Sequence, residues 1–312
     1  MTDALAAALA DVLGASEVRD VVRLSGGASR DTFRFEADGR PLILQRQRSG
    51  DVRDMNNEAL VVRAAGAAGV PAAQVVASSA DASAIGSAFM VLTAVDGETI
   101  ARKILRDERF AHARGVLPAQ LGAALAQLHA VDTSGLGSLP ATDQMVQYRE
   151  MLDQLGQPHP TFELAFKWLE AHRPAPRPAA LVHGDFRLGN VIVGDDGLRA
   201  VIDWELAHLG DPMEDLGWLC VKAWRFGSAL PVAGVGEYQQ LFDTYQEAGG
   251  RAIDPDEVRW WEVMGTLKWG IMCIMQANAH TAGFTRSHEL AAIGRRVCEN
   301  EHDLFLALEG RW

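Results

Sequence analysis

The sequence predicts an α+β fold with a small antiparallel sheet in an N-terminal lobe and a larger, mainly helical C-terminal lobe. Short apolar runs separated by turns that contain glycine or proline fill the first 95 residues, as is typical of an antiparallel sheet. From Gly97 onward, apolar residues recur at helical spacing. Within that part, residues 180–205 hold three short strand-like runs that end in polar side chains. We therefore expect two lobes, at residues 1–95 and 96–312.

Composition sets the first bounds on the class of protein. The chain has 312 residues, of which 48% are apolar and 22% charged, enough for a substantial core. No run approaches the roughly 18 apolar residues that span a bilayer. The first residues, MTDALAAALADVLG, lack the basic region of a signal peptide and read as an amphipathic helix. These features predict a cytoplasmic protein without a membrane partner, and buried free thiols at its three cysteines, Cys220, Cys273 and Cys298.

The net charge of −12 is unevenly distributed and excludes one class of partner. Nucleic acid requires a basic surface, so this chain is not expected to bind it. Residues 1–95 contain 9 arginines and 11 acids, a net charge of −2, which leaves −10 for the rest. The acidity therefore belongs to the C-terminal part, where it either attracts a cationic substrate or serves solubility alone.

Five strands and one helix are expected after the N-terminal helix. The strands are predicted at Val21–Ser25, Asp31–Phe35, Pro41–Gln47, Gln74–Ser78 and Ala88–Ala94, and the helix at Asp51–Ala68. The turn Gly26-Gly27-Ala28-Ser29 joins the first two strands. Backbone amides of such a turn can cover phosphates, although alone it indicates only a hairpin.

The C-terminal part is expected to consist of helices around the segment 180–205. Helices are predicted at Leu117–Ala130, from Asp211-Pro212 onward, and at Gly236–Gly249, Pro255–His280 and Ser287–Leu308. A proline-rich linker at Arg173–Pro178 precedes strand-like runs at Ala180–Val182, Val191–Val193 and Leu198–Ile202, and Asp195-Asp196-Gly197 predicts a hairpin turn between the last two.

Polar residues at the ends of these runs carry the chemistry. Asp185 precedes Asn190 by five positions, the D-x-x-x-x-N spacing of a kinase catalytic loop, in which Asp takes the proton of the attacking hydroxyl and Asn holds magnesium. Asp203 follows the hairpin, where a second carboxylate would bind the same ion. Magnesium prefers hard oxygen ligands and retains waters, so Asp, Asn and phosphates suffice.

Two segments resemble a known family. HGDFRLGN, from His183 to Asn190, and IDWELAHLGDPMEDLGW, from Ile202 to Trp218, are similar to the signature segments of the aminoglycoside phosphotransferase and choline kinase-like family. That family has the protein-kinase-like fold. The subgroup with the greatest similarity is the phosphotransferase domain related to those fused to some acyl-CoA dehydrogenases. The resemblance covers the chain from about Leu24 to the C-terminus.

The resemblance implies an ATP- and Mg²⁺-dependent transfer of phosphate to the hydroxyl of a small molecule. By analogy with the family, Asp185 and Asn190 are catalytic, Asn190 and Asp203 hold magnesium, and Asp215 supports the loop. Glu205 would bind the metal through water or orient Asp203. The nucleotide is expected to contact Gly26, Gly27 and Ser29 through its phosphates, and Thr93 to Val95 through its adenine.

The cation that contacts the phosphates is the point of departure from the family. Family members often have a basic residue on the third strand where this chain has Gln45, and no lysine precedes Lys103. The sequence therefore leaves Arg46 or Arg48 as candidates, with Arg46 preferred. Glu58, on the following helix, is expected to pair with the cation.

Other classes of enzyme fit the sequence less well. A metal-dependent hydrolase would need histidines beyond His183, which is expected to be a scaffold residue, and G-x-S-x-G and Walker motifs are absent. A protein kinase would carry a long segment between Asp203 and an A-P-E motif, whereas Gly210-Asp211-Pro212 follows at once. A non-catalytic nucleotide-binding module would be expected to lose Asp185, Asn190 or Asp203.

The acceptor is predicted from the segment Trp260–Met275, which contains three tryptophans, three methionines and a single acid, Glu262. We expect this segment to form core, with an apolar wall of the acceptor site as the alternative. Such residues suit a partly apolar metabolite, for example a hydroxyacyl thioester, better than a polycationic aminoglycoside. An aminoglycoside or macrolide kinase is the second hypothesis, and GTP in place of ATP remains open.

Overall fold

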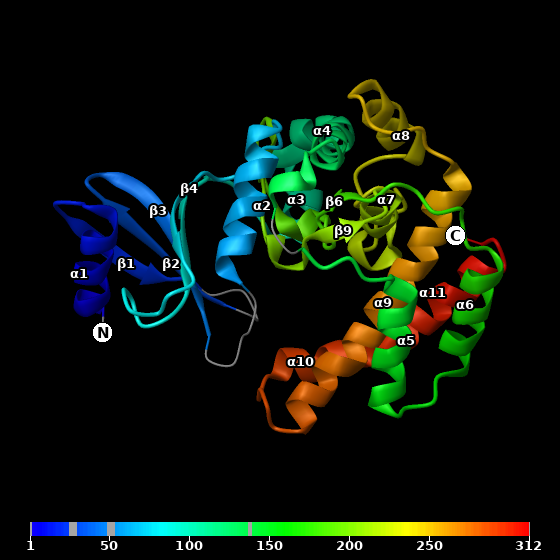
Figure 1. Cartoon of the computed structure of the whole chain (residues 1–312). Helices are drawn as coiled ribbons and strands as arrows, with labels where there is room; N and C mark the ends of the chain where they lie inside the picture. The colour runs from blue at the N-terminus through cyan, green and yellow to red at the C-terminus, as the bar shows by residue number, and fades with distance from the viewer. Residues whose placement is uncertain (1, 25–29, 49–53, 137–138, 312) are drawn as a thin grey trace.

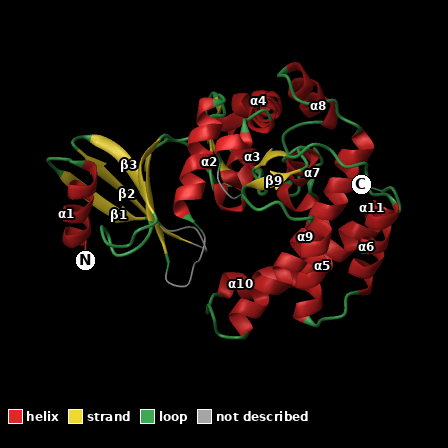
Figure 2. Ribbon diagram, in the orientation of Figure 1, coloured by secondary structure: helices red, strands yellow, loops and turns green. Residues whose placement is uncertain are grey.

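The computed structural model describes residues 2–24, 30–48, 54–136 and 139–311, and it has the protein-kinase-like fold. A five-stranded antiparallel sheet forms the N-terminal part, and a larger, mainly helical part follows (Figures 1 and 2). The order of the strands is β1-β2-β3-β5-β4, with β1 Val18–Arg23, β2 Arg30–Ala37, β3 Arg40–Gln47, β4 Val75–Ser79 and β5 Phe89–Thr93.

The five predicted strands are therefore present, and the largest shift in their bounds is at β1. That strand begins three residues before the predicted Val21. Its pairing with β2 is irregular between Arg19 and Val22, and Asp20 has a φ of 54°. The irregularity interrupts the alternation of apolar and polar residues, so the sequence pattern starts only after it. The predicted phosphate turn, residues 26–29, lies outside the described residues.

Each face of the sheet packs against a different helix. Helix α1, Thr2–Leu13, covers one face, where Leu9 packs with Phe35 and Leu44. Helix α2, Met55–Ala67, lies beside the other face, toward the C-terminal part (Figure 1). Because successive side chains of a strand point to opposite faces, each residue of β2 and β3 faces either α1 or α2.

Nine α-helices occur in the described residues of the C-terminal part. They are α3 Ala101–Arg106, α4 Ala111–His129, α5 Gln144–Leu155, α6 Pro160–Ala171, α7 Met213–Cys220, α8 Tyr238–Glu247, α9 Pro255–Thr281, α10 His288–Ile293 and α11 Val297–Leu308. Helices α5, α6, α10 and α11 pack around the long α9 (Figure 1). Helices α3, α5 and α6 were not predicted as separate helices. A single helix was predicted for α10 and α11, which a 3₁₀ turn at Gly294–Arg296 separates.

The tryptophan- and methionine-rich segment lies in α9 and forms core, as expected. Trp260, Met264 and Trp269 are buried. The expectation for the cysteines is correct for Cys220 and Cys273, which are buried free thiols, and wrong for Cys298, which is exposed. Cys298 is the second residue of α11, and its thiol donates to the Arg295 carbonyl.

Two short sheets position the loop between residues 183 and 190. Strand β6, Ala180–Val182, pairs with β9, His208–Gly210, and β7, Val191–Gly194, pairs with β8, Gly197–Val201. Two single bridges join this second hairpin to other segments. Val201 pairs with Ala72, in the connection between α2 and β4, and Val193 pairs with Glu98, after β5. The loop is thus tied to both parts of the molecule.

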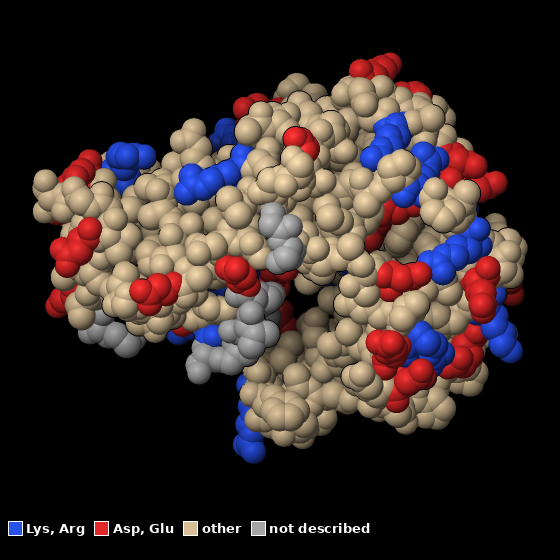
Figure 3. Space-filling view, viewed as in Figure 1, with Lys and Arg blue, Asp and Glu red and all other residues tan. Residues whose placement is uncertain are grey.

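A deep hollow separates the N-terminal part from the lower helices in the space-filling view, and acidic side chains are visible inside it (Figure 3). The sheet and α2 lie on one side of this hollow and the C-terminal helices on the other (Figure 1). Among the described residues, no helix is both long and apolar enough to cross a membrane.

Candidate active site

The loop that contains Asp185 and Asn190 runs from β6 to β7, and a glycine shapes it. Gly184 has a φ of 77°, and a Cβ at this position would lie 2.5 Å from the Leu206 carbonyl oxygen. A side chain here would therefore both strain the backbone and clash with it. The loop ends in a 3₁₀ turn, Leu188–Asn190, which leads directly into β7.

Asp185 and Asn190 meet in the structure, as their spacing predicts. The Asn190 Nδ2 group donates to Asp185 Oδ2 at 2.6 Å and to the Asp185 carbonyl oxygen at 3.0 Å. The other carboxylate oxygen, Oδ1, accepts from Arg187 Nε at 3.0 Å and from Trp218 Nε1 at 2.8 Å. Since the Asn190 amide nitrogen faces Asp185, its Oδ1 atom is the group that can bind a cation.

Asp215 supports the loop that contains Asp185, as the resemblance to the family implied. This carboxylate, on α7, accepts from the backbone amides of His183 at 2.7 Å and Gly184 at 2.9 Å. His129 Nε2 lies 3.2 Å from the same group, and His129 Nδ1 lies 2.9 Å from the Tyr245 hydroxyl. Burial alone would raise the pKa of Asp215, but the hydrogen bond and charge of His129 outweigh it and lower the pKa.

His183 is a scaffold residue in this arrangement. Its ring is buried; Nε2 lies 3.0 Å from the Ile202 carbonyl oxygen, and Nδ1 accepts from the Asp185 amide at 3.2 Å. Burial lowers the pKa of His183, so the ring is neutral, with its proton on Nε2. Both nitrogens are committed to the backbone, which removes His183 from any metal site.

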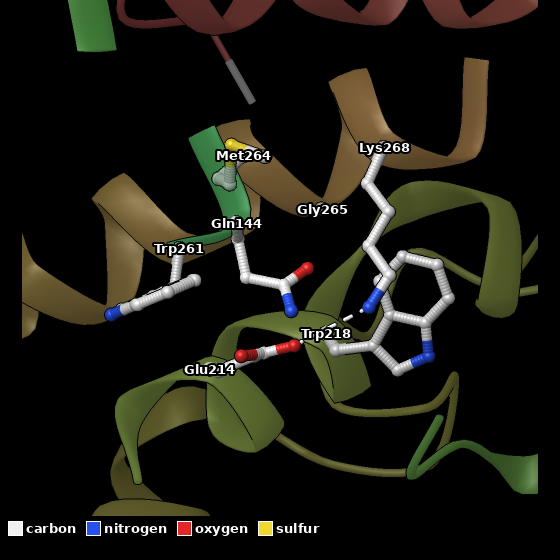
Figure 4. A pocket seen from close by; sticks show the side chains of 7 residues that line it. All are labelled: Gln144, Glu214, Trp218, Trp261, Met264, Gly265 and Lys268. Carbon is white, nitrogen blue, oxygen red and sulfur yellow. Dashed lines mark hydrogen bonds and ion pairs between the residues drawn. The ribbon is translucent and has the colours of Figure 1, made fainter. Parts of the chain in front are cut away.

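A second polar network, which sequence reasoning missed, supports the loop from α9. Lys268 Nζ donates to the Gly184 carbonyl oxygen at 3.0 Å and lies 3.3 Å from Glu214 Oε1. The ammonium group sits 4.7 Å from the centre of the Trp218 ring, beside a cavity of about 10 Å³ (Figure 4). The available signal was a lone lysine in an otherwise apolar helical segment, because a buried lysine needs charged or polar partners.

Asp203 lies at the end of β8 in a left-handed conformation, with a φ of 66°. Burial, followed by the nearby charges of Glu205 and Asp185, raises the pKa of Asp203 to about 7. A divalent cation bound here would lower the pKa of Asp203 and so favour its ionised form. Asp203 and Asn190 thus offer hard oxygens of the kind that magnesium requires.

The described residues contain no group of three or more His, Cys, Asp or Glu side chains arranged as a metal cage. Magnesium does not require one, because it binds with one or two protein oxygens, substrate phosphates and waters. The donor set of Asn190 and Asp203 fits such an ion.

The predicted cation of β3 lies on the wrong face of the sheet. Arg46 is paired in register with Phe89, which belongs to the core under α1, and its guanidinium lies 5.5 Å from the centre of the Phe33 ring. Both Arg46 and Arg48 form ion pairs with Asp31. The expected pairing of either residue with Glu58 is therefore wrong.

Glu58 instead pairs with Arg30, on β2. Arg30 Nη1 donates to Glu58 Oε1 at 2.6 Å, and Arg30 Nη2 donates to Glu58 Oε2, so the contact is bidentate and buried. Arg30 immediately follows the predicted phosphate turn and was not considered in the sequence analysis. Alternation of side chains along β2 and β3 could have identified it, but only with the strand register known.

The expected adenine-binding residues lie between the two parts of the molecule. Thr93 ends β5, where its amide donates to the Gln74 carbonyl oxygen and its hydroxyl accepts from the Gln74 amide, both at 2.9 Å. Val95 lies in the connection that follows. The expected phosphate contacts Gly26, Gly27 and Ser29 lie outside the described residues.

Comparison with known proteins identifies the family. A model of the phosphotransferase enzyme family matches residues 20–261. The chain belongs to this family. A mouse protein, acyl-CoA dehydrogenase family member 10, is 28% identical over 247 residues, which is 74% of this chain and 23% of that protein. The chain thus spans about a quarter of the length of this relative.

Solved structures of other phosphotransferases share the fold. A Ralstonia eutropha protein assigned as an aminoglycoside phosphotransferase is 21% identical, with a TM-score of 0.79 over 99% of this chain and 98% of that one. Spectinomycin phosphotransferase APH(9)-Ia, in complex with ADP and spectinomycin, is 12% identical, with a TM-score of 0.70 over 98% of each chain. Similarity at this level establishes the fold, and the phosphotransferase assignment rests on the family match.

Proposed function

We propose that this phosphotransferase moves the γ-phosphate of ATP, with Mg²⁺, to a hydroxyl group of a small molecule. The observation that carries the proposal is the meeting of Asp185 and Asn190 at 2.6 Å, close to the half-buried Asp203. The acceptor hydroxyl needs a base, and the metal that binds the phosphates needs oxygen donors, which an amide and a carboxylate provide. We assign nucleotide binding to residues 1–95 and the acceptor to residues 96–312.

Asp185 orients the acceptor hydroxyl and takes its proton as the new oxygen–phosphorus bond forms. The bond between the γ-phosphorus and the oxygen bridging to ADP then breaks, and ADP leaves with that oxygen. Arg187 and Trp218 hold Asp185 Oδ1, so the rotation of this carboxylate is fixed. Asn190 and Asp203 would hold magnesium, which supplies charge neutralisation for the phosphates when bound.

The surroundings of Asp185 support a partly apolar acceptor. The rings of Trp218, Trp224 and Trp269 follow one another at centroid distances of 5.2 and 4.8 Å, and Arg187 lies 4.8 Å from the centre of the Trp224 ring. Glu262, the one acid of Trp260–Met275, is buried and bonded to Arg225 and Tyr238. Trp218 and Arg187 therefore border the base, and they favour a neutral or anionic acceptor such as a hydroxyacyl thioester.

An aminoglycoside acceptor is the second candidate, favoured by the similarity to the spectinomycin enzyme and by the net charge of −10 after residue 95. Phosphorylation of a polycation would depend on long-range attraction to that charge, so its rate would fall steeply with salt. Arg187 and Trp218, which contact Asp185, favour the first candidate.

Turnover of ATP against a panel of acceptors tests both candidates. The panel contains kanamycin, choline, sugars and hydroxyacyl-CoA thioesters, each assayed with Mg²⁺ and with EDTA, and with Asp185→Asn as the control for contaminating kinases. We expect turnover with a hydroxylated, partly apolar compound and little with kanamycin. Efficient phosphorylation of kanamycin that weakens as salt rises would contradict the proposed acceptor and establish the second candidate.

A further inference from the structure

The guanidinium of Arg30 lies on the face of the sheet that packs against α2. Arg30 and Glu58 are both buried, and their bidentate contact joins β2 to α2. Arg30 Nη1 also lies 3.3 Å from Gln45 Oε1, on the neighbouring strand. The positive charge of Arg30 therefore lies beside the position of β3 at which this chain has a neutral side chain.

Strand register explains why Arg30 reaches this place and Arg46 does not. Gln45 is paired with Thr32 on one side and with Met90 on the other, and Met90 belongs to the core that includes α2. Arg30 is two residues from Thr32 and shares its face. Arg46 is one residue from Gln45 and points to the opposite face, since the period of a strand is two.

Arg30 also reaches the C-terminal part. Its Nη2 atom lies 3.8 Å from Glu205 Oε2, two residues beyond Asp203. Arg30 is thus held between helix α2 and Glu205. The guanidinium therefore lies close to the segment 203–205, which contains the carboxylate to which we assign the metal.

We propose that Arg30 is the cation that binds the phosphates of the nucleotide, in the role that the family often gives to a basic residue on the third strand. The inference rests on the proposed function and assigns a residue of that same site. Glu58 acts as the positioning residue, because both of its oxygens hold the guanidinium in one orientation. A guanidinium carries five N–H donors in a planar fork, so one arginine can bind a carboxylate and a phosphate at the same time.

Calorimetric titration of the full chain with MgATP tests the inference. Arg30→Gln should raise the Kd for MgATP about tenfold to hundredfold, the loss typical of a charge-assisted hydrogen bond. The Kd for adenosine should stay the same, because adenosine lacks the phosphates that the cation contacts. Arg23→Gln is the matched control, since Arg23 is an exposed arginine on the neighbouring strand β1.

Two further variants separate a lost cation from a damaged fold. Arg30→Gln/Glu58→Gln leaves no buried charge unpaired and should show the same rise in the Kd for MgATP, with an unchanged far-ultraviolet circular dichroism spectrum. Arg30→Gln/Gln45→Lys returns a cation to the same face and should recover most of the lost affinity. Failure of this recovery would mean that position 30 acts only through the fold, and would overturn the inference.

The results distinguish this inference from the proposed function. If the wild-type protein binds neither MgATP nor MgGTP, both are overturned. If it binds MgATP and the Arg30→Gln/Glu58→Gln variant binds equally well, the inference alone is overturned. If the Kd for MgATP rises in Arg46→Gln and does not change in Arg30→Gln, then Arg46 on β3, and not Arg30, binds the phosphates.

Discussion

Two charged groups, Asp185 in the C-terminal part and Arg30 in the N-terminal part, are held in different ways. Asp185 lies in one contiguous segment, and backbone amides, an indole and a buried aspartate fix it and its loop from several sides. Arg30 is held by Glu58 from a helix and by Glu205 from the other part of the molecule. The Asp185 carboxylate is thus held by two neutral donors, from Asn190 and Trp218, and by one charged donor, from Arg187, whereas Arg30 is paired with two carboxylates.

This difference indicates which side adapts when the nucleotide binds. Neutral hydrogen bonds to the backbone are short-ranged and allow one geometry, so the base should keep its position. Ion pairs tolerate a change of partner, and an incoming phosphate can replace a carboxylate at Arg30 with little change in charge. The following substitutions test the contrast, from the largest expected effect to the smallest.

Asp185→Asn should lower kcat about 10²- to 10⁴-fold, because the proton acceptor for the hydroxyl is lost. The Kd for MgATP should stay near the wild-type value, since the lost carboxylate acts on the acceptor. Steady-state kinetics and calorimetry on the same preparation measure the two effects. The control Asp195→Asn removes an exposed carboxylate of the β7–β8 turn. Retention of more than about a tenth of the wild-type kcat would exclude Asp185 as the base.

Asp203→Ala should abolish the dependence of nucleotide binding on magnesium, because a hard anionic ligand is removed from the phosphate-bound ion. We expect the Kd for ATP with Mg²⁺ to approach that measured with EDTA. Calorimetry in the two buffers gives the comparison, with Asp196→Ala in the same hairpin as the control. An unchanged affinity for MgATP in Asp203→Ala would remove this residue from the metal site.

Asp215→Ala should destabilise the protein by about 3–5 kcal/mol, since it leaves buried donors without their acceptor. Asp215 supports the loop that contains Asp185, so this loss of stability tests whether the base is held rigidly. Urea denaturation measures the free energy of unfolding. Asp243→Ala, at an exposed position of α8, should change it by less than about 0.5 kcal/mol. Equal effects in the two variants would argue against the supporting role.

His208 should make a small, pH-dependent contribution to stability. Burial alone would lower its pKa, but the hydrogen bond and charge of Glu214 and the Leu206 carbonyl outweigh burial, so the pKa is raised. The folded state therefore binds the proton more tightly than the unfolded state, whose histidine pKa is about 6.5. This stabilisation is complete below about pH 6.5 and is lost as the pH rises through the folded pKa.

The difference in free energy of unfolding between wild type and His208→Gln should accordingly be largest near pH 6 and shrink toward pH 8.5. Urea denaturation across this range measures it, with His172→Gln, an exposed histidine, as the control. A difference that grows with pH would show that the ring is neutral in the folded state.

The parts of the site that the sequence predicted are those encoded by neighbouring residues. Asp185 and Asn190 belong to one loop, and glycine, a strand on each side and fixed spacing bring them together without reference to the rest of the chain. Asp215 lies in the second signature segment, and its support of the loop was expected from that resemblance. The five strands could be predicted because each is a short apolar run bounded by turn residues in the local sequence.

The parts that were missed depend on partners far along the chain. Arg30 and Glu58 are 28 residues apart, and their contact depends on the register of two strands. Arg46 was preferred because it lies nearer the body of the strand than Arg48, but a shift of one residue along a strand moves a side chain to the other face. Lys268 and Gly184 are 84 residues apart and meet only once α9 packs beneath the loop.

The indole that donates to Asp185 gives the protein an internal optical reporter. All eight tryptophans and all three tyrosines follow residue 147, so the N-terminal sheet contributes none of the tyrosine or tryptophan emission. Fluorescence during denaturation therefore follows the helical part alone, whereas circular dichroism follows both. Divergence of the two curves would reveal that the sheet and the helices unfold separately, and quenching at Trp218 would register the arrival of an acceptor at the base.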